Sequence, residues 1–172
     1  MAKLLITGMS GTGKSSAIAI LASHGHRAVD ADDRAFSMWA KDSAGEDDWV
    51  WRDDVMARLL DAHRGGHLFV AGCATNQGTF YPAFDHVVLL SAPGSILLER
   101  VAQRTSNPYG KSPEERALIL RHLREVEPLL RRTCTAEIDA TLPLAEVVRR
   151  LEAIADGPVQ GQIRQGRGDG EP

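Results

Sequence analysis

The residues with the clearest chemistry lie near the N-terminus, where glycines alternate with small hydroxyl side chains before a lysine. Residues 8–15 read GMSGTGKS, which fits the phosphate-loop pattern G-x-x-x-x-G-K-S/T. Such glycines let successive backbone amides point into one concavity, and the helix that follows presents its positive end to the same anion. A lysine reaches the β- and γ-phosphates, and a serine hydroxyl coordinates Mg²⁺. We therefore predict a site for ATP and Mg²⁺ formed by Gly8, Gly11, Thr12, Gly13, Lys14, Ser15 and Ser16.

This loop has to join a strand to a helix, and the apolar pattern supplies both. Short apolar runs predict strands at 3–7, 27–29, 68–71, 86–90 and 136–139. Longer segments predict helices at 14–24, 32–40, 49–63, 94–104, 113–130 and 144–155. Ser112, Pro113 and Glu115 give the helix at 113 a capping box. The alternation predicts an α/β fold of three layers, a five-stranded parallel sheet with helices on both faces.

Length and composition narrow the class of protein. The chain of 172 residues is long enough for one domain, which we place at 1–156, and the Gly- and Gln-rich residues 157–172 predict a disordered tail. A net charge of −3 favours neither a nucleic acid nor a membrane as partner. The first apolar run is too short for a signal peptide or a membrane span, which predicts a cytoplasmic protein. Cys73 and Cys134 lack metal-ligand spacing and are expected to be core thiols. A monomer and a homodimer both remain open.

The order of these features resembles the nucleoside-monophosphate kinase and shikimate kinase group. The shared features are a phosphate loop at the N-terminus, a length near 170 and an Arg-rich segment late in the chain. The resemblance covers about residues 1–155. It implies a P-loop kinase fold and an ATP- and Mg²⁺-dependent transfer of the γ-phosphoryl group to a small-molecule acceptor. It also implies an acceptor-side insert at about 33–64 and a short lid at about 105–112.

The same resemblance assigns roles to two aspartates after the second strand. Shikimate and gluconate kinases carry an Asp-x-Asp there, and Asp30 and Asp32 match that spacing. One carboxylate helps to hold Mg²⁺ through water, a role we give to Asp30, and the other orients or deprotonates the acceptor hydroxyl, a role we give to Asp32. The sequence does not show which of the two lies nearer the acceptor. The alternative for Asp32 is an N-cap of the next helix.

Basic residues near the lid resemble the phosphate and adenine contacts of this group. At the end of the predicted helix 94–104, Arg100 corresponds to the arginine that lies against adenine and Arg104 to the one that reaches phosphate. Lys111, in the turn-rich lid, is expected to close over the transferring phosphoryl group. Arg124 stands at about the place where shikimate kinases hold the acceptor's carboxylate. The alternatives are a solvated helix face for the arginines and a structural turn for the lid.

The acceptor side departs from the group. Three glycines follow the third strand of shikimate kinases, whereas this chain has Gly72-Cys73-Ala74, which disfavours shikimate. Asn76 and Gln77 follow the same strand, at the edge where α/β sheets bind ligands, and are predicted acceptor contacts, with a simple turn as the alternative. The insert carries all three tryptophans and an excess of acidic residues, which disfavours a strongly anionic acceptor. Arg34 and Arg52 are its candidate substrate contacts and keep a nucleotide acceptor open.

Several functions therefore compete. The first is a kinase for a nucleoside, a nucleotide or a polyhydroxyl metabolite. The second is a kinase that inactivates an antibiotic, and the third is a nucleotide-binding regulator that hydrolyses ATP slowly. The chain has no Asn-Lys-x-Asp motif, which argues against a GTPase. No acidic residue ends the third predicted strand, which argues against an AAA-type ATPase.

Overall fold

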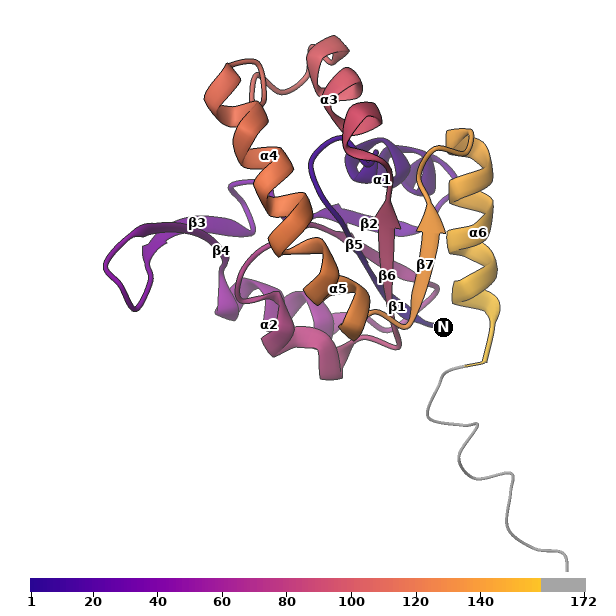
Figure 1. Cartoon of the computed structure of the whole chain (residues 1–172). Coiled ribbons are helices and arrows are strands. Elements are labelled where there is room, and N and C mark those ends of the chain that lie inside the picture. Colours follow the sequence, from indigo (N-terminus) through magenta and orange to yellow (C-terminus); the bar gives the residue numbers. More distant parts are fainter. Residues whose placement is uncertain (159–172) are drawn as a thin grey trace, which may run out of the picture.

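Five parallel strands form the central sheet of the computed structural model, which describes residues 1–158 (Figure 1). The spatial order is β2-β5-β1-β6-β7, and every neighbouring pair is parallel. This confirms the predicted sheet, and the predicted strand bounds agree to within one residue. The strands are β1 (Lys3–Thr7), β2 (Arg27–Asp30), β5 (Leu68–Ala71), β6 (His86–Ser91) and β7 (Ala136–Asp139).

The continuous apolar runs form strands because both faces of the sheet are covered. Leu4, Leu5 and Ile6 of β1 are fully buried, yet they serve two different cores, since successive side chains point to opposite faces. One core contains Leu4 and Ile6 and packs under α1 (Lys14–Ser23) and α6 (Leu144–Asp156). The other contains Leu5 and packs under α2 (Asp53–Ala62) and a 3₁₀-helix (Gln77–Ala83). The prediction of helices on both faces is confirmed.

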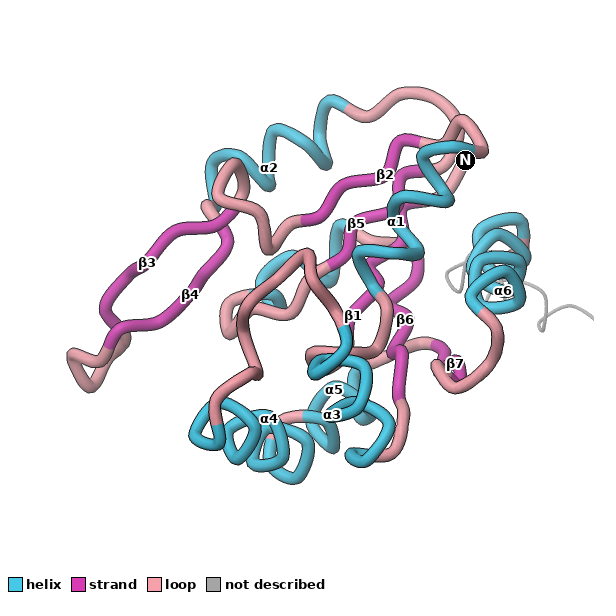
Figure 2. The backbone as a smooth tube through the Cα atoms, turned by 90° about the horizontal axis from the view of Figure 1, so that it is seen from above, coloured by secondary structure: helices cyan, strands magenta, loops and turns pink. Residues whose placement is uncertain are grey.

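The segment predicted to be an acceptor-side insert, at about residues 33–64, differs from its predicted secondary structure. Residues 32–40 and 49–52 are not helical. Instead β3 (Ser37–Lys41) pairs antiparallel with β4 (Asp47–Trp51) in a hairpin that projects from the body of the protein (Figures 1 and 2). Trp39 and Trp49 face each other across it, edge to face with ring centroids 5.1 Å apart, which is the kind of aromatic pair that stabilises hairpins. The Asp42 carboxylate accepts two backbone N–H bonds within the turn, a turn signal that the helical pattern concealed.

The later helices follow the prediction with one break. α3 (Gly94–Gln103) and α4 (Pro113–Glu125) begin where expected, and the capping box is confirmed, because the Ser112 hydroxyl accepts from the Glu115 N–H at 3.2 Å. The helix predicted to run from 113 to 130 ends at Glu125, and a separate α5 (Glu127–Thr133) follows. Pro128 explains the break, since a proline removes a backbone donor and clashes with the preceding turn.

Two sequence predictions concern the chain ends and membranes. The predicted tail begins at residue 157, and 159–172 lie outside the described residues. Among the helices of residues 1–158, none combines the length and the hydropathy that a membrane crossing requires.

Candidate active site

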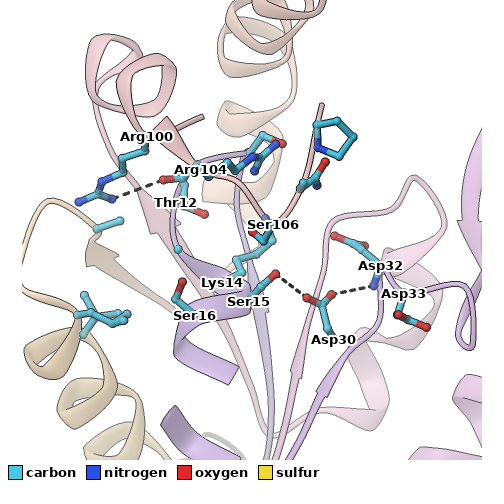
Figure 3. A pocket seen from close by; sticks show the side chains of 18 of the residues that line it. Thr12, Lys14, Ser15, Ser16, Asp30, Asp32, Asp33, Arg100, Arg104 and Ser106 are labelled. Carbon is cyan, nitrogen blue, oxygen red and sulfur yellow. Dashed lines mark hydrogen bonds between the residues drawn. The ribbon is translucent and has the colours of Figure 1, made fainter. Parts of the chain in front are cut away.

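A cavity of about 760 Å³ opens at the carboxyl ends of β1 and β2 (Figure 3). Parallel α/β sheets bind ligands at this edge because the loops that leave the strands converge there. The cavity brings together most of the residues predicted to bind ATP and Mg²⁺. Its walls are formed by residues 10–16, Asp30, Asp32, Asp33, Arg100, Arg104, Ser106, Asn107, Pro108, Ala140, Leu142, Leu144 and Val147.

The phosphate loop occupies the floor of this cavity between β1 and α1. Gly8 and Gly11 both have positive φ, and a Cβ at these positions would lie 2.3 Å from the Leu90 oxygen and 2.8 Å from the Leu97 oxygen. No larger residue fits such backbone contacts without displacing the loop. The Lys14 ammonium folds over the loop and donates to the Gly8 oxygen at 2.7 Å. The arrangement is a preformed cradle of amides with a cation at its rim.

Ser15 and Asp30 form the oxygen-rich side of the loop. The Ser15 hydroxyl donates to Asp30 Oδ2 at 2.5 Å, and Asp30 Oδ1 accepts from the Asp32 N–H at 3.1 Å (Figure 3). A hydroxyl beside one carboxylate fits Mg²⁺, which takes oxygen ligands, keeps several waters and relies on the phosphates of its nucleotide. Within residues 1–158 no three His, Cys, Asp or Glu side chains cluster as an all-protein metal site would require. The donor set therefore suits a metal that arrives with a nucleotide.

Asp32 is the carboxylate that faces the interior of the site. Its oxygens accept from the Cys73 N–H at 3.1 and 3.2 Å and from the Trp51 indole N–H at 3.4 Å. Burial raises the pKa of Asp32 above its usual value, while Lys14 and these donors act in the opposite direction. A carboxyl held this way is a better proton acceptor near neutral pH than an exposed aspartate.

Sequence reasoning missed Trp51, because its contact with Asp32 depends on the hairpin. Trp51 ends β4, and its side chain is almost completely buried against Phe80. The Asn76 side chain holds the backbone at the end of β4: its Oδ1 accepts from the Trp51 N–H at 3.0 Å and its Nδ2 donates to the Trp51 oxygen at 2.9 Å. The alternation of Trp49 and Trp51 in a short polar-flanked run was the available signal for a strand.

Arg100 and Arg104 lie at the end of α3, on the side of the cavity opposite Asp30 (Figure 3). Arg100 donates to the Gly11 oxygen at 3.5 Å and Arg104 to the Tyr109 oxygen at 2.7 Å. The Arg104 Nε is buried without a hydrogen-bond partner among the described residues, and burial lowers the pKa of this guanidinium. An unsatisfied guanidinium donor at the wall of a phosphate cradle fits an anionic ligand.

The segment predicted to be a lid, at about residues 105–112, differs from the prediction in the position of Lys111. Ser106, Asn107 and Pro108 line the cavity, but Lys111 does not. The Lys111 ammonium instead donates to the oxygens of Val101, Ala102 and Arg104 at 2.6–2.8 Å, where it caps the C-terminus of α3. At the other side, the Glu115 carboxylate accepts from the N–H groups of Gly110, Lys111 and Ser112. The base of the lid is therefore held at both helix ends.

The remaining predicted acceptor residues lie outside the cavities. Asn76 holds β4, and the buried Gln77 accepts from the Thr7 hydroxyl and donates to Tyr81, so the polar ends of both are engaged. Three arginines also stand outside the cavity walls, with two exposed and one half-buried: Arg34, Arg124 and Arg52.

A second, smaller cavity of about 150 Å³ lies beyond Lys14 and Asp32. On α4, Ile119 and His122 face it, one turn apart, whereas Arg124 points to solvent. The i, i+3 spacing of Ile119 and His122 was the signal for this face of the helix. Its lining is Gly8, Met9, Ser10, Lys14, Asp32, Cys73, Tyr109, Ile119 and His122.

Apolar side chains close the far end of the larger cavity. Ala140 and Leu142 come from the loop after β7, and Leu144 and Val147 from the start of α6. A flat apolar wall next to Arg100 suits a purine ring.

A comparison of the sequence with models of known protein families identifies the family of this chain. A family model described as AAA domain matches residues 4–121. The chain belongs to this family. The name of this family is also that of the AAA-type ATPases, against which the sequence analysis argued. The basis of that argument is unchanged, because Gly72 and Cys73 follow β5 at the place where those ATPases carry an acidic residue. Among curated protein sequences, none matches this chain.

Solved structures of kinases share the fold of this AAA domain family member. Shikimate kinase from Acinetobacter baumannii, in complex with shikimate, has a TM-score of 0.63 at 17% identity and covers 90% of this chain and 92% of its own. A gluconokinase from Sinorhizobium meliloti 1021 has a TM-score of 0.62 at 20% identity over 96% and 98%. Deoxyadenosine kinase from M. mycoides with bound dATP has a TM-score of 0.53 at 12% identity over 90% and 100%. The predicted P-loop kinase fold is thereby confirmed.

Proposed function

We propose that this protein is an ATP- and Mg²⁺-dependent kinase that transfers the γ-phosphoryl group of ATP to a hydroxyl of a small-molecule acceptor. The observation that supports it most strongly is that Lys14 and Asp32 line both cavities. A nucleotide in the larger cavity and an acceptor in the smaller one would meet where a cation and a carboxylate already stand. Phosphoryl transfer requires this combination of charge stabilisation and positioning.

The donor side binds ATP through several independent groups. The amides of residues 8–15 and the N-terminus of α1 hold the phosphates, and Arg104 adds the guanidinium donor that is unsatisfied in the described structure. Ser15 and Asp30 would hold Mg²⁺, which when bound offsets phosphate charge. The adenine would lie between Arg100 and the apolar wall around Leu142.

The acceptor side supplies the base. Asp32 accepts the hydroxyl proton as the acceptor oxygen forms its bond to the γ-phosphorus, and the bond from that phosphorus to the bridging oxygen of ADP breaks. The raised pKa of Asp32 favours this proton transfer. The Lys14 ammonium leaves the Gly8 oxygen and moves with the transferring phosphoryl group, where it stabilises the negative charge that develops. The products are a phosphorylated acceptor and ADP.

Relatives of the same fold support this direction. Kinases whose structures contain shikimate or dATP match about nine-tenths of this chain. We place the reaction in the cytoplasm with a small molecule as partner, as the sequence predicts. The non-kinase alternative, a nucleotide-binding regulator that hydrolyses ATP slowly, would not need a second cavity that shares Lys14 and Asp32 with the first.

The test is acceptor-dependent ADP formation. The purified chain is incubated with ATP and Mg²⁺, with and without panels of neutral and anionic hydroxyl compounds. We expect acceptors to stimulate ADP formation, and we expect Lys14→Ala to lower the stimulated rate by about 100-fold or more. Binding of ATP without stimulation by any acceptor would refute the kinase and favour a regulator.

A further inference from the structure

The smaller cavity has an unusual charge balance for a site beside a phosphate loop. Of the described residues that line it, Lys14 alone carries a permanent positive charge, and that ammonium already contacts the oxygens of Gly8 and Met9. The carboxylate of Asp32 stands next to it. The other polar side chains are the Ser10 hydroxyl, the Tyr109 phenol, the Cys73 thiol and the His122 imidazole. None of the lining residues is an arginine.

The arginines near the site are committed elsewhere or face solvent. Arg104 lines the larger cavity and donates to the Tyr109 oxygen, and Arg124 points away from the cavity on α4. Arg34 is exposed at the start of the insert. A carboxylate or phosphate on the acceptor would lose its hydration beside Asp32 without a guanidinium to replace it. Burying an anion next to another anion in this way is strongly unfavourable.

The same lining suits hydroxyl groups. Phenol, imidazole and thiol groups donate or accept hydrogen bonds without requiring a counter-ion, and a hydroxyl can pair with each. The thioether of Met9 and the side chain of Ile119 provide an apolar surface for the C–H face of a polyol. At about 150 Å³ against about 760 Å³, this cavity has about a fifth of the volume of the larger one, which favours a small acceptor over a nucleotide.

We infer that the acceptor is a small uncharged polyhydroxyl molecule, without a carboxylate or phosphate, that is recognised by Tyr109, His122 and Cys73. This inference rests on the proposed kinase function. Such an acceptor differs from the carboxylated acceptors of shikimate kinase and gluconokinase because it has no carboxylate. The observation that supports this difference is the absence of guanidinium groups from the described lining of the smaller cavity.

Matched acceptors test it directly. Acceptor-dependent ADP formation is measured for D-glucitol against D-gluconate, myo-inositol against quinate, and glycerol against glycerate, each with saturating ATP and Mg²⁺. We expect kcat/KM to be at least about tenfold higher for the uncharged member of every pair that reacts. A faster carboxylated member overturns this inference but leaves the kinase function standing. If none of the six compounds stimulates ADP formation, and no member of a wider set of phosphorylated and carboxylated acceptors does so, both this inference and the kinase function are overturned.

A gain of function at His122 adds a second readout. His122→Arg brings a guanidinium to the cavity wall, and we expect it to reduce the preference for the uncharged acceptor by about tenfold or more, through a lower KM for the anionic partner. Arg124→His, on the solvent side of the same helix, is the matched control and should keep the wild-type preference. Thermal unfolding confirms that each variant is folded. If folded His122→Arg keeps the wild-type preference for the uncharged acceptor, His122 does not contribute to the recognition of the acceptor.

Discussion

Replacing Gly72 with alanine displaces the proposed base without touching the nucleotide. A Cβ at Gly72 would lie 2.7 Å from Asp32 Oδ1 and 2.9 Å from Trp51 Cζ2, whereas ordinary contact begins near 3.4 Å. Relief of the first contact requires a shift of the carboxylate by about 0.7 Å, the difference between 3.4 and 2.7 Å. A displacement of about 1 Å at a reacting group costs on the order of 100-fold in rate. We therefore expect Gly72→Ala to lower kcat by about 10- to 100-fold.

The assay separates this effect from a loss of fold or of nucleotide. Acceptor-dependent ADP formation gives kcat, and calorimetry with ATP and Mg²⁺ gives the nucleotide affinity. The affinity should change by less than about twofold, because a Cβ at Gly72 meets Asp32 and Trp51 and none of the phosphate-loop residues or arginines that we assign to ATP. Gly65→Ala is the matched control, since a Cβ there meets nothing within 4 Å. Wild-type kcat in a folded Gly72→Ala protein would mean that the position of Asp32 does not govern transfer.

Three further predictions concern Asp32, its indole donor and a helix cap. Trp51→Phe removes a hydrogen bond that lowers the pKa of Asp32, so the acidic limb of the kcat profile should move to higher pH. Asp32→Asn should abolish transfer yet stabilise the fold at neutral pH, because folding raises the pKa of this carboxyl and its ionisation therefore costs stability. The gain, measured by thermal unfolding, should grow as pH rises and disappear below about pH 3.9. Ser112→Ala should lower the free energy of unfolding in urea by about 1 kcal/mol, since it removes the capping box.

Each of these has its own control and contrary result. Trp39→Phe, on the exposed part of the hairpin, should leave the pH profile unchanged, and an equal shift in both variants would assign the effect to the hairpin as a whole. A lower stability of Asp32→Asn at neutral pH would show that the attraction of Lys14 outweighs burial. Ser23→Ala, whose hydroxyl donates only within its own helix, should change the free energy of unfolding by less than about 0.5 kcal/mol. Equal losses in the two serine variants would contradict the capping argument.

Local patterns predicted the parts of this protein whose structure is locally determined. The runs around Leu5 and Val70 are apolar throughout because both faces of their strands are buried, and together with the alternation of strands and helices this predicts a parallel sheet. The phosphate loop has its conformation encoded in glycine spacing, and the helix at Pro113 carries its own start signal. For these segments sequence neighbours supply the decisive contacts.

The parts that sequence did not predict depend on contacts between distant segments. The hairpin at residues 37–51 resembles an amphipathic helix in composition, and only its pairing and the Asn76 clamp select the strands. The direction of α4 decided that His122 and not Arg124 meets the smaller cavity, a difference of two positions along a helix. The Lys111 ammonium is held by three carbonyls at the end of α3, which no local pattern encodes.

The place at which Asn76 holds the hairpin has a practical consequence for engineering. Asn76 joins the base of the hairpin, at Trp51, to the segment after β5. The Trp39 side chain is exposed, and the turn between β3 and β4 lies away from the central sheet (Figure 2). Residues 42–46, the turn beyond the paired strands and beyond the contact of Asp48 with Thr75, can therefore be shortened, lengthened or exchanged for a tag without altering the orientation of the proposed base. The exposed indole at position 39, in contact with its neighbour at 49, would then serve as a built-in fluorescence probe of such grafts.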